Sequence, residues 1–292
     1  MSFSIVTDTS ANLPSAYLRE RGIGVIPLSY NIHGQELTCL DTEKFDGGSY
    51  YSAIRSGAKV MTSQITPQLY LDTLTPILES GQDVLFVGMS SGISGSFNSA
   101  QIASVQLRES FPERKIRLVD TLAASLGEGI LVMRAVEYRS GGMSIDEAAD
   151  LLTEKRRGVY QAVMLEDLMY LHRGGRISGA KAIIGTVLGV RPILKGNSAG
   201  ELIVISKARG RKAALAALLD KYISLVDKPE EQTVGIVYTD KPEQAEELAN
   251  MIREKLPPKQ LLVVCYEPVT GSHVGPGTVA LFFEGKDGVR EL

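Results

Sequence analysis

Short apolar runs alternate along the chain with longer segments in which apolar residues recur every three or four positions. Runs rich in Val, Ile and Phe are typical of buried strands, and three- to four-residue spacing indicates one face of a helix. In the first half, the runs predict strands at residues 3–9, 24–32, 84–89 and 116–121. Helices are expected over 14–22, 67–81, 97–110 and 124–142. This alternation is the signature of an α/β layer fold.

The second half repeats the alternation after a change of pattern near residues 155–160. Strands are expected at 161–167, 200–208, 233–240, 260–268 and 278–285, and helices at 211–226 and 242–256. Residues 270–278 are expected to form a glycine-rich turn. The small-residue segment 177–190 is either the lining of a pocket or an ordinary buried helix. A chain of 292 residues exceeds most single cores, which rarely grow past roughly 250–300 residues. We therefore expect two domains, 1–157 and 158–292.

Composition narrows the class of protein. The net charge of −3 gives no support for binding nucleic acid or an anionic membrane. Two cysteines without a CxxC motif and three histidines without metal-ligand spacing indicate neither a zinc site nor a disulfide framework. The first residues do not resemble a signal peptide, and no stretch approaches the ~20 apolar residues of a membrane span. Nucleotide-binding glycine motifs are also missing from the sequence. A reduced cytoplasmic protein is expected.

The stretch SSGISGSFNSA, Ser90 to Ala100, directly follows an apolar strand and precedes a helical pattern. Hydroxyls and free backbone N–H groups converge in such a turn, which predicts an anion site. The same place also holds GMSSG at 88–92, which fits the GxSxG pattern of a nucleophile elbow. Ser90 would then be a nucleophile, with Asp120 or Asp240 and His273 completing a hydrolase triad. Both interpretations remain open at this point.

Three further motifs carry hydroxyls or cations. The TSQ of residues 62–64 is a second hydroxyl cluster, or else the cap of the helix that begins at Pro67. HRGGRIS at 172–178 predicts a tight exposed turn with its cations pointing outward. KARGRK at 207–212 places cations at a helix start, where they oppose the macrodipole. SHVGPGT carries His273 in an expected loop.

Taken together, these motifs resemble the DegV family of fatty-acid-binding proteins, the acyl carriers of bacterial fatty acid kinase. The matching stretches are VTDTSANLP at 6–14, TSQ at 62–64, SSGISGSFNSA at 90–100, LHRGGRIS at 171–178, RPIL at 191–194, KARGRK at 207–212 and HVGPG at 273–277. They follow the family's order and spacing over nearly the whole chain. Small departures occur, such as Ser96-Phe97 where the family often has Thr and Tyr, and His172-Arg173 where lysines are common.

The resemblance implies a two-domain α/β architecture, with a parallel sheet in the N-terminal domain and a mixed sheet in the C-terminal one. It implies that one long-chain fatty acid lies in a buried pocket and that a separate ATP-dependent kinase subunit phosphorylates its carboxyl group. The chain itself would hold no catalytic machinery, metal or cofactor. The residues implied to bind the carboxylate are Thr62, Ser63, Ser91, Ser94 and Gly95. Those implied to face the phosphate or the kinase are Arg176, Arg209 and His273.

Elementary energetics agree with a buried acyl chain. Burying about 15 methylenes at ~0.8 kcal/mol each provides roughly 12 kcal/mol, of which association entropy removes at least ~4 kcal/mol. An unpaired buried carboxylate would cancel the remainder, so hydroxyl and N–H donors must meet it, and we expect them at the closed end of the pocket.

Overall fold

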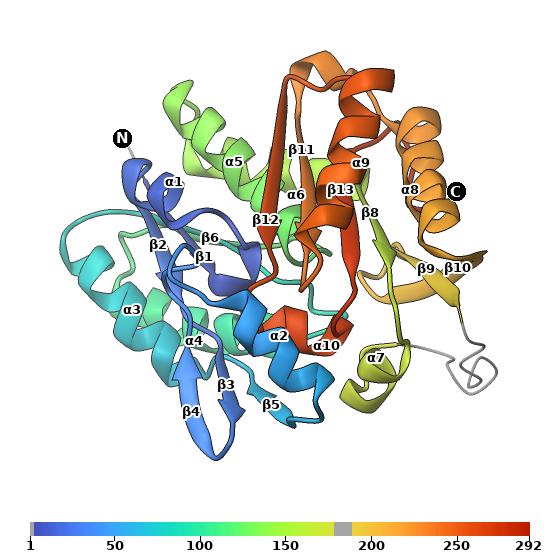
Figure 1. The fold of residues 1–292 in the computed structure, drawn as a ribbon. Helices are drawn as coiled ribbons and strands as arrows, with labels where there is room; N and C mark the ends of the chain where they lie inside the picture. The colour runs from blue at the N-terminus through green and yellow to red at the C-terminus, as the bar shows by residue number, and fades with distance from the viewer. Residues whose placement is uncertain (1–2, 178–188) are drawn as a thin grey trace.

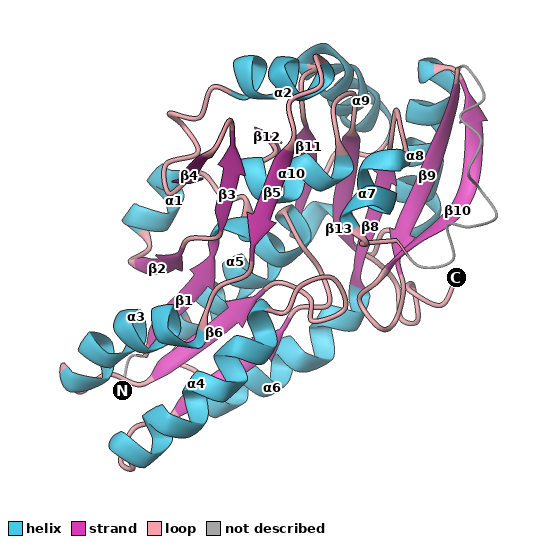
Figure 2. Ribbon diagram, turned by 90° about the horizontal axis from the view of Figure 1, so that it is seen from below, coloured by secondary structure: helices cyan, strands magenta, loops and turns pink. Residues whose placement is uncertain are grey.

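The computed structural model describes residues 3–177 and 189–292. Its first sheet, sheet A, is parallel and has the strand order β2-β1-β6-β7. The strands are β1 (Ser4–Asp8), β2 (Ile23–Ile26), β6 (Val84–Gly88) and β7 (Ile116–Asp120). The accompanying helices are α1 (Ser15–Glu20), α3 (Pro67–Glu79), α4 (Ser96–Ser110), α5 (Leu126–Ser140) and α6 (Ile145–Lys155). Helices α3 and α4 pack together, as do α5 and α6, and sheet A lies between these two pairs (Figure 2).

A second, mixed sheet, sheet C, has the order β10-β9-β8-β13-β11-β12. Of its described neighbouring strands, β11 and β12 pair parallel and all others pair antiparallel. Its strands are β8 (Val159–Met164), β9 (Val190–Gly196), β10 (Leu202–Arg209), β11 (Thr233–Tyr238), β12 (Gln260–Cys265) and β13 (Val279–Glu284). Helices α8 (Arg211–Leu225) and α9 (Pro242–Lys255) lie on one side of sheet C and α5 on the other (Figure 1). The expected α/β fold, with one parallel and one mixed sheet, is confirmed.

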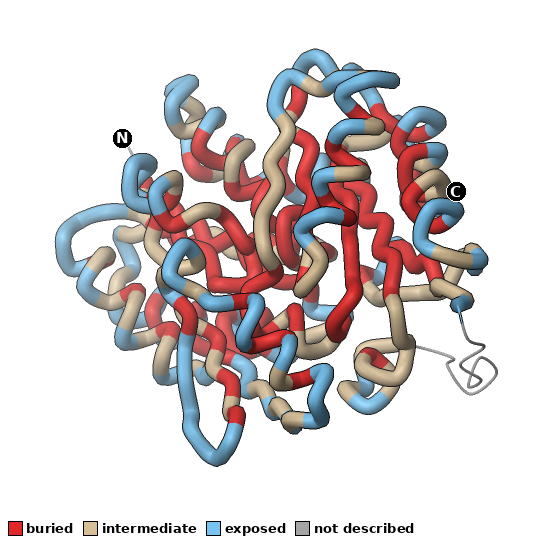
Figure 3. The backbone as a smooth tube through the Cα atoms, viewed as in Figure 1, coloured by how far each residue is buried: buried red, intermediate tan, exposed pale blue. Residues whose placement is uncertain are grey.

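Smaller elements close the side of the molecule where the two sheets meet. A three-stranded antiparallel sheet, sheet B, has the order β4-β3-β5. Its strands are β3 (Ser29–Ile32), β4 (Gln35–Thr38) and β5 (Val60–Ser63); the short helices are α2 (Gly47–Arg55), α7 (Met169–Gly174) and α10 (Pro268–Val274). Single 3₁₀ turns occur at Thr9–Ala11, Arg156–Gly158 and Pro229–Glu231. Strand β4 is exposed throughout, whereas the strands of sheet A and the centre of sheet C are buried (Figure 3).

One apolar core crosses the middle of the chain. It joins residues of sheet A and its helices to Val163, Val237 and Phe282 of sheet C, while a second core fills the space between sheet C and helices α8 and α9. The division predicted between residues 157 and 158 falls in the 3₁₀ turn that precedes β8.

Two sequence predictions were wrong about local structure. Residues 24–32 form two strands in different sheets, because Pro27 between them has no N–H for a sheet ladder, and Leu28 N–H donates to Thr9 Oγ1 (3.0 Å) instead. The expected turn at 270–278 begins as helix α10. Glu267 caps that helix, accepting hydrogen bonds from Val269 N (2.8 Å) and Thr270 N (2.5 Å). No sequence prediction covered helices α2, α6 and α7 or strands β4, β5 and β9, and most of segment 177–190 lies outside the described residues.

Asn12 joins the two halves of the molecule. It has a left-handed backbone (φ 56°), which asparagine tolerates, and its side chain is buried. Its Nδ2 donates to the carbonyl oxygen of Cys265 (2.7 Å), and its Oδ1 accepts from the N–H of Glu267 (2.8 Å). Both partners belong to the segment that leads from β12 into α10.

Replacing Asn12 with alanine should destabilise the protein by about 2–4 kcal/mol, because two buried backbone groups lose their partners. Urea unfolding measures this difference. The matched control is N98A, an exposed position on α4, which should stay within about 0.5 kcal/mol of wild type. Equal stability of the two variants would contradict the bridging role of Asn12.

Candidate functional site

A pocket of about 780 Å³ lies where the carboxyl end of sheet A faces sheet C and helix α10. The order of sheet A reverses between β1 and β6, and ligands of open α/β sheets bind outside the strand ends at such a switch point. The apolar lining is Leu28, Met89, Ile93, Ala123, Ala124, Val163, Leu171, Leu202, Tyr266, Val269, Val274 and Phe282.

Polar side chains gather in one part of this lining. Thr62, Ser63 and Gln64 come from β5 and the residue after it, Ser94 from the turn after β6, Thr270 and His273 from α10, and Arg176 from the segment after α7. Ser63 and Gln64 are exposed, whereas most of the apolar lining is buried. These donors therefore lie where the pocket reaches solvent, whereas Ser125 and Gln161 add buried polar groups to the lining. The expected place of the carboxylate donors, at the closed end, stays a prediction. Among the described residues, no Asp or Glu lines the pocket.

Thr62 and His273 form the centre of the polar cluster. In β5, Thr62 is paired with the buried Tyr30 of β3, so its side chain is turned inward, and its Oγ1 lies 2.9 Å from His273 Nε2. Burial, with a contribution from the Arg176 charge, lowers the pKa of His273 to about 4. The imidazole is therefore neutral at pH 7. The sequence left open whether TSQ caps a helix, but the cap of α3 is Thr66, whose Oγ1 accepts from Leu69 N (3.3 Å).

The serine-rich turn brings Ser94 to the pocket. The carbonyl oxygen of Ser90 accepts the N–H groups of Ile93 and Ser94, both at 3.2 Å, which folds the turn back before α4 begins. Ser94 Oγ lies 3.0 Å from Ser96 Oγ, which also accepts from the N–H of Ile65 (3.1 Å). Ser96 therefore fixes the turn against the segment between β5 and α3.

Gly95 lies against the segment that carries Thr62 and Ser63. A larger residue at this position would force the exposed Gln64 amide to move. Gly95 also precedes the first residue of α4, and the positive end of that helix dipole thus lies beside Ser94.

Arg176 is the cation of the pocket. Its Nε donates to the carbonyl oxygen of Ile93 (3.2 Å) and its Nη1 to that of Gly174, so the side chain crosses to the serine turn. The prediction that the arginines of HRGGRIS point outward is wrong for Arg176. It holds for the exposed Arg173, whose guanidinium lies 4.9 Å from the ring centre of Tyr170.

Two residues predicted for the site lie elsewhere. Ser91 is exposed and does not line the pocket; its Oγ donates to Asp120 Oδ2 (2.6 Å) and its N–H to Asp120 Oδ1 (3.2 Å). Arg209 is exposed at the far end of β10, on the edge strand of sheet C, seven residues beyond the pocket residue Leu202. At about 3.3 Å per residue, this separates the two by roughly 23 Å.

The structure does not assemble the hydrolase triad considered from the sequence. Ser90 is fully buried, and its Oγ donates to the carbonyl oxygen of Gly200 (2.9 Å). His273 pairs with Thr62, Asp120 with Ser91, and the Asp240 carboxylate with Arg55. Within residues 3–177 and 189–292, no hydrogen bond joins Ser90 to a histidine.

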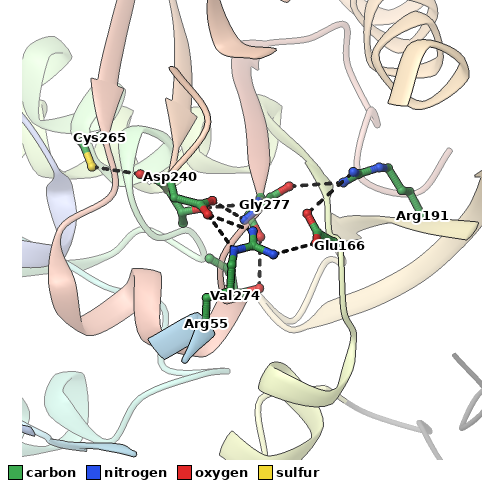
Figure 4. A network of polar contacts seen from close by, with 9 residues as sticks. Arg55, Glu166, Arg191, Asp240, Cys265, Val274 and Gly277 are labelled. Atoms are coloured by element: carbon green, nitrogen blue, oxygen red, sulfur yellow. Dashed lines mark hydrogen bonds and ion pairs between the residues drawn. The ribbon is translucent and has the colours of Figure 1, made fainter. Parts of the chain in front are cut away.

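An ion-pair network supports the segment that follows α10 (Figure 4). Arg55 of α2 contacts Glu166 Oε1 and Asp240 Oδ2, each at 2.8 Å. Asp240 Oδ1 accepts from the N–H of Gly277 (2.6 Å), and Arg191 Nη1 donates to the Gly277 carbonyl oxygen (3.4 Å). These contacts fix the end of the segment that carries His273.

Sequence reasoning missed most of the apolar lining and the polar residues Ser125, Gln161 and Thr270. The buried strands β8 and β13 supply Val163 and Phe282, and periodicity alone does not tell which face of such a strand meets a pocket. Thr270 lies one helical turn before His273, and its buried Oγ1 has no partner among the described residues. In that part of the chain, no cluster of three metal-ligating side chains occurs and no helix is long and apolar enough to cross a bilayer.

Comparisons with known proteins agree on one family. Residues 2–286 match the family model described as "Uncharacterised protein, DegV family". A DegV domain-containing protein of Clostridium perfringens is 37% identical over 283 residues, covering 97% of each chain. A solved DegV family protein from Thermus thermophilus, described as fatty acid binding, is 30% identical with a TM-score of 0.87, over 98% of this chain and 100% of that one.

A more distant likeness adds to the fold comparison. The fatty acid kinase B3 protein of Streptococcus pneumoniae, solved loaded with linoleic acid, is 20% identical. Its TM-score is 0.83 over 98% of this chain and 100% of that one. This likeness shows a shared fold.

The low pKa of His273 predicts an acid-sensitive contribution to stability. The folded-state value of about 4 lies below the ordinary 6.5, so the unfolded chain binds the extra proton first. The contribution is therefore complete above pH 6.5 and is lost as the pH falls towards about 4. Urea unfolding of wild type and H273Q from about pH 7.5 to about pH 5 should show wild type losing more stability than the variant. The control is H33Q, an exposed position in the β3–β4 turn, and an H273Q profile parallel to wild type would contradict the argument.

Proposed function

The chain belongs to the DegV family, and on this premise we propose that it binds one long-chain fatty acid and presents the carboxyl group to a separate ATP-dependent kinase. The observation that carries the proposal is the pocket itself. An apolar lining meets a cluster of neutral donors and one arginine, with no carboxylate in the described lining. The fatty acid binding described for the Thermus thermophilus relative supports the same ligand class.

In this proposal Thr62, Ser63, Ser94 and Gly95 bind the fatty acid carboxylate, the first three through their hydroxyls and Gly95 through its backbone N–H. Thr270 is a further donor, since its buried hydroxyl has no partner among the described residues. Neutral donors hold the anion without a tight ion pair, and they also tolerate its conversion to an acyl phosphate. The neutral imidazole of His273 fits this set of neutral donors, because it forms a hydrogen bond with Thr62 and adds no charge.

The position of the donors suits transfer to a second protein. Because Ser63 and Gln64 are exposed, a carboxylate bound beside them stays within reach of a partner, while the acyl chain lies against the buried strands. A carboxylate oxygen would attack the terminal phosphorus of ATP on the kinase, and ADP would leave. Arg176 lies in the lining, where it would neutralise charge on the transferred group. The chain would contribute no catalytic machinery, metal or cofactor of its own, and it would work in the cytoplasm beside ATP.

Ser91 and Arg209 take different parts in this proposal. Ser91 acts indirectly, because its hydrogen bonds to Asp120 fix the turn that carries Ser94. Arg209, exposed on β10, would contact the kinase rather than the ligand. No observation favours hydrolysis by Ser90.

We predict that the purified protein carries a fatty acid. Native mass spectrometry should detect the bound molecule, and denaturing extraction should identify it. T62A should weaken binding roughly 5- to 150-fold, because one hydrogen bond to the carboxylate is worth about 1–3 kcal/mol. S91A is the comparison variant and should weaken binding less than T62A, since Ser91 does not line the pocket and acts only through the turn that carries Ser94. A protein that remains empty after incubation with palmitate and oleate would refute fatty acid binding.

A further prediction concerns phosphoryl transfer from ATP to the bound fatty acid. It is measured as the acyl phosphate formed from loaded protein, ATP and the fatty acid kinase subunit. R176Q should lower the maximal rate, because Arg176 lies at the reacting group. R209Q should raise the concentration of carrier needed for half-maximal rate and leave fatty acid affinity unchanged. Acyl phosphate formed without the kinase would refute the carrier role, and identical kinetics of all three proteins would refute both assignments.

A further inference from the structure

A second groove lies on the other side of the serine-rich turn, between α4, β7 and the end of α6. It opens widely to solvent. Its polar lining comes chiefly from Gln101, Ser104, Arg108, Arg117, Asp120 and Arg156. Phe97 and Val105 supply an apolar edge. Nothing in the proposed function uses this groove.

Two of the three arginines that line the groove have no carboxylate partner. Arg117 is paired with Asp146 (2.7 Å) and Asp150 (2.5 Å). Arg108 and Arg156 have no carboxylate within 4.0 Å in the described part of the chain, and Arg108 donates to Ser104 Oγ (3.3 Å) and to the carbonyl oxygen of Ile116 (2.9 Å). The remaining residues, 1–2 and 178–188, contain neither Asp nor Glu.

A further arginine, Arg290, lies behind the groove and does not line it. Arg290 is only 4% exposed and also lacks a carboxylate within 4.0 Å among residues 3–177 and 189–292. It donates to the carbonyl oxygens of Val159 (2.9 Å) and Leu122 (2.6 Å). Burial, followed by the charge of Arg156, lowers the pKa of Arg290 to about 10, so the two guanidinium groups are electrostatically coupled.

Arg156 and Arg290 each have a donor nitrogen without an acceptor in the described structure. Arg156 Nε and Arg290 Nη2 are shielded from solvent and have no acceptor in the described structure. Arg156 does use its Nη1, which donates to the backbone oxygen of Asp120 (2.6 Å). Buried N–H groups of cations left without acceptors are costly, and an anion is the partner that satisfies both the hydrogen bonds and the charge.

The Asp120 carboxylate does not supply the acceptors that Arg156 and Arg290 lack. It lines the groove and favours the charged forms of Arg156 and Arg290, but its oxygens are already taken. Oδ1 accepts from Ser91 N (3.2 Å) and Leu122 N (3.0 Å), and Oδ2 accepts from Ser91 Oγ (2.6 Å).

We propose that this groove binds a phosphate group, held by the Arg156 guanidinium together with Arg108 and the side-chain amide of Gln101. A phosphate has enough acceptor oxygens for several N–H donors, and its charge of about −1.5 to −2 would pair with the two guanidinium groups. The group is either free phosphate or the phosphate of a small soluble monoester, whose remainder would lie against Phe97 and Val105. This site is separate from the fatty acid pocket and does not depend on the ligand proposed there.

The test is isothermal titration of the protein, with its pocket filled as purified, using inorganic phosphate at constant ionic strength and sodium chloride as the blank. Wild type should bind one phosphate saturably. R156Q should bind it at least about tenfold more weakly, since charge-assisted hydrogen bonds are lost. R157Q is the matched control: Arg157 is the neighbouring residue, exposed and not part of the groove, so its variant should bind as wild type does.

Two further titrations locate the site and identify the source of the phosphate. R176Q should keep phosphate binding, whereas loss of binding in R176Q but not in R156Q would move the phosphate to the pocket and overturn the proposal. Glycerol 3-phosphate that binds as well as or better than phosphate would indicate a monoester, and weaker binding would indicate free phosphate. Absence of saturable heat in wild type, or equal weakening in R156Q and R157Q, would also overturn it. Circular dichroism checks that each variant is folded.

Discussion

The packing of helix α5 between the two sheets is the constraint on which the rest of the structure depends. Its first three turns are buried almost all round, as expected for a helix with a sheet on either side. Gly235 of β11 makes this close contact possible, because a side chain there would collide with Leu126. With α5 in this place, the carboxyl ends of β1 and β6 face α10 and sheet C. The pocket lies between these surfaces.

This arrangement also places acidic residues behind the pocket wall, where they could repel an anion. Asp8 accepts from the N–H of the lining residue Met89 (3.2 Å), and Glu267 precedes α10. Burial raises the pKa of Asp8, raises that of Glu267 to about 7, and raises that of Glu128 on α5 well above its ordinary value. Raised pKa values reduce the negative charge behind the wall. Because His273 is neutral as well, Arg176 is the main charge of the described lining.

The sequence predicted the parts of the site that lie next to strong local signals. The apolar run before Ser90 located β6, and the family resemblance grouped Ser94 with TSQ, which lies in a different sheet. Ser91 could not be placed, since one residue of difference in a turn decides whether a hydroxyl meets the pocket or Asp120. Arg209 could not be placed either, because the β9–β10 pairing carries it to a sheet edge. Helix α10 was hidden by its glycines, although Glu267-Pro268 is a cap followed by a favoured first residue.

The serine-rich turn has many hydroxyls because it meets several surfaces at once. Ser90 fixes the tip of the β9–β10 hairpin through Gly200, and Ser96 fixes the segment that leads from β5 into α3. Ser91 holds Asp120 on the side of the arginine groove, and Ser94 lines the pocket. A catalytic elbow needs one activated hydroxyl, whereas this turn distributes four hydroxyls over four neighbours. Its position between the pocket and the arginine-lined groove therefore places it beside both of the proposed anion sites.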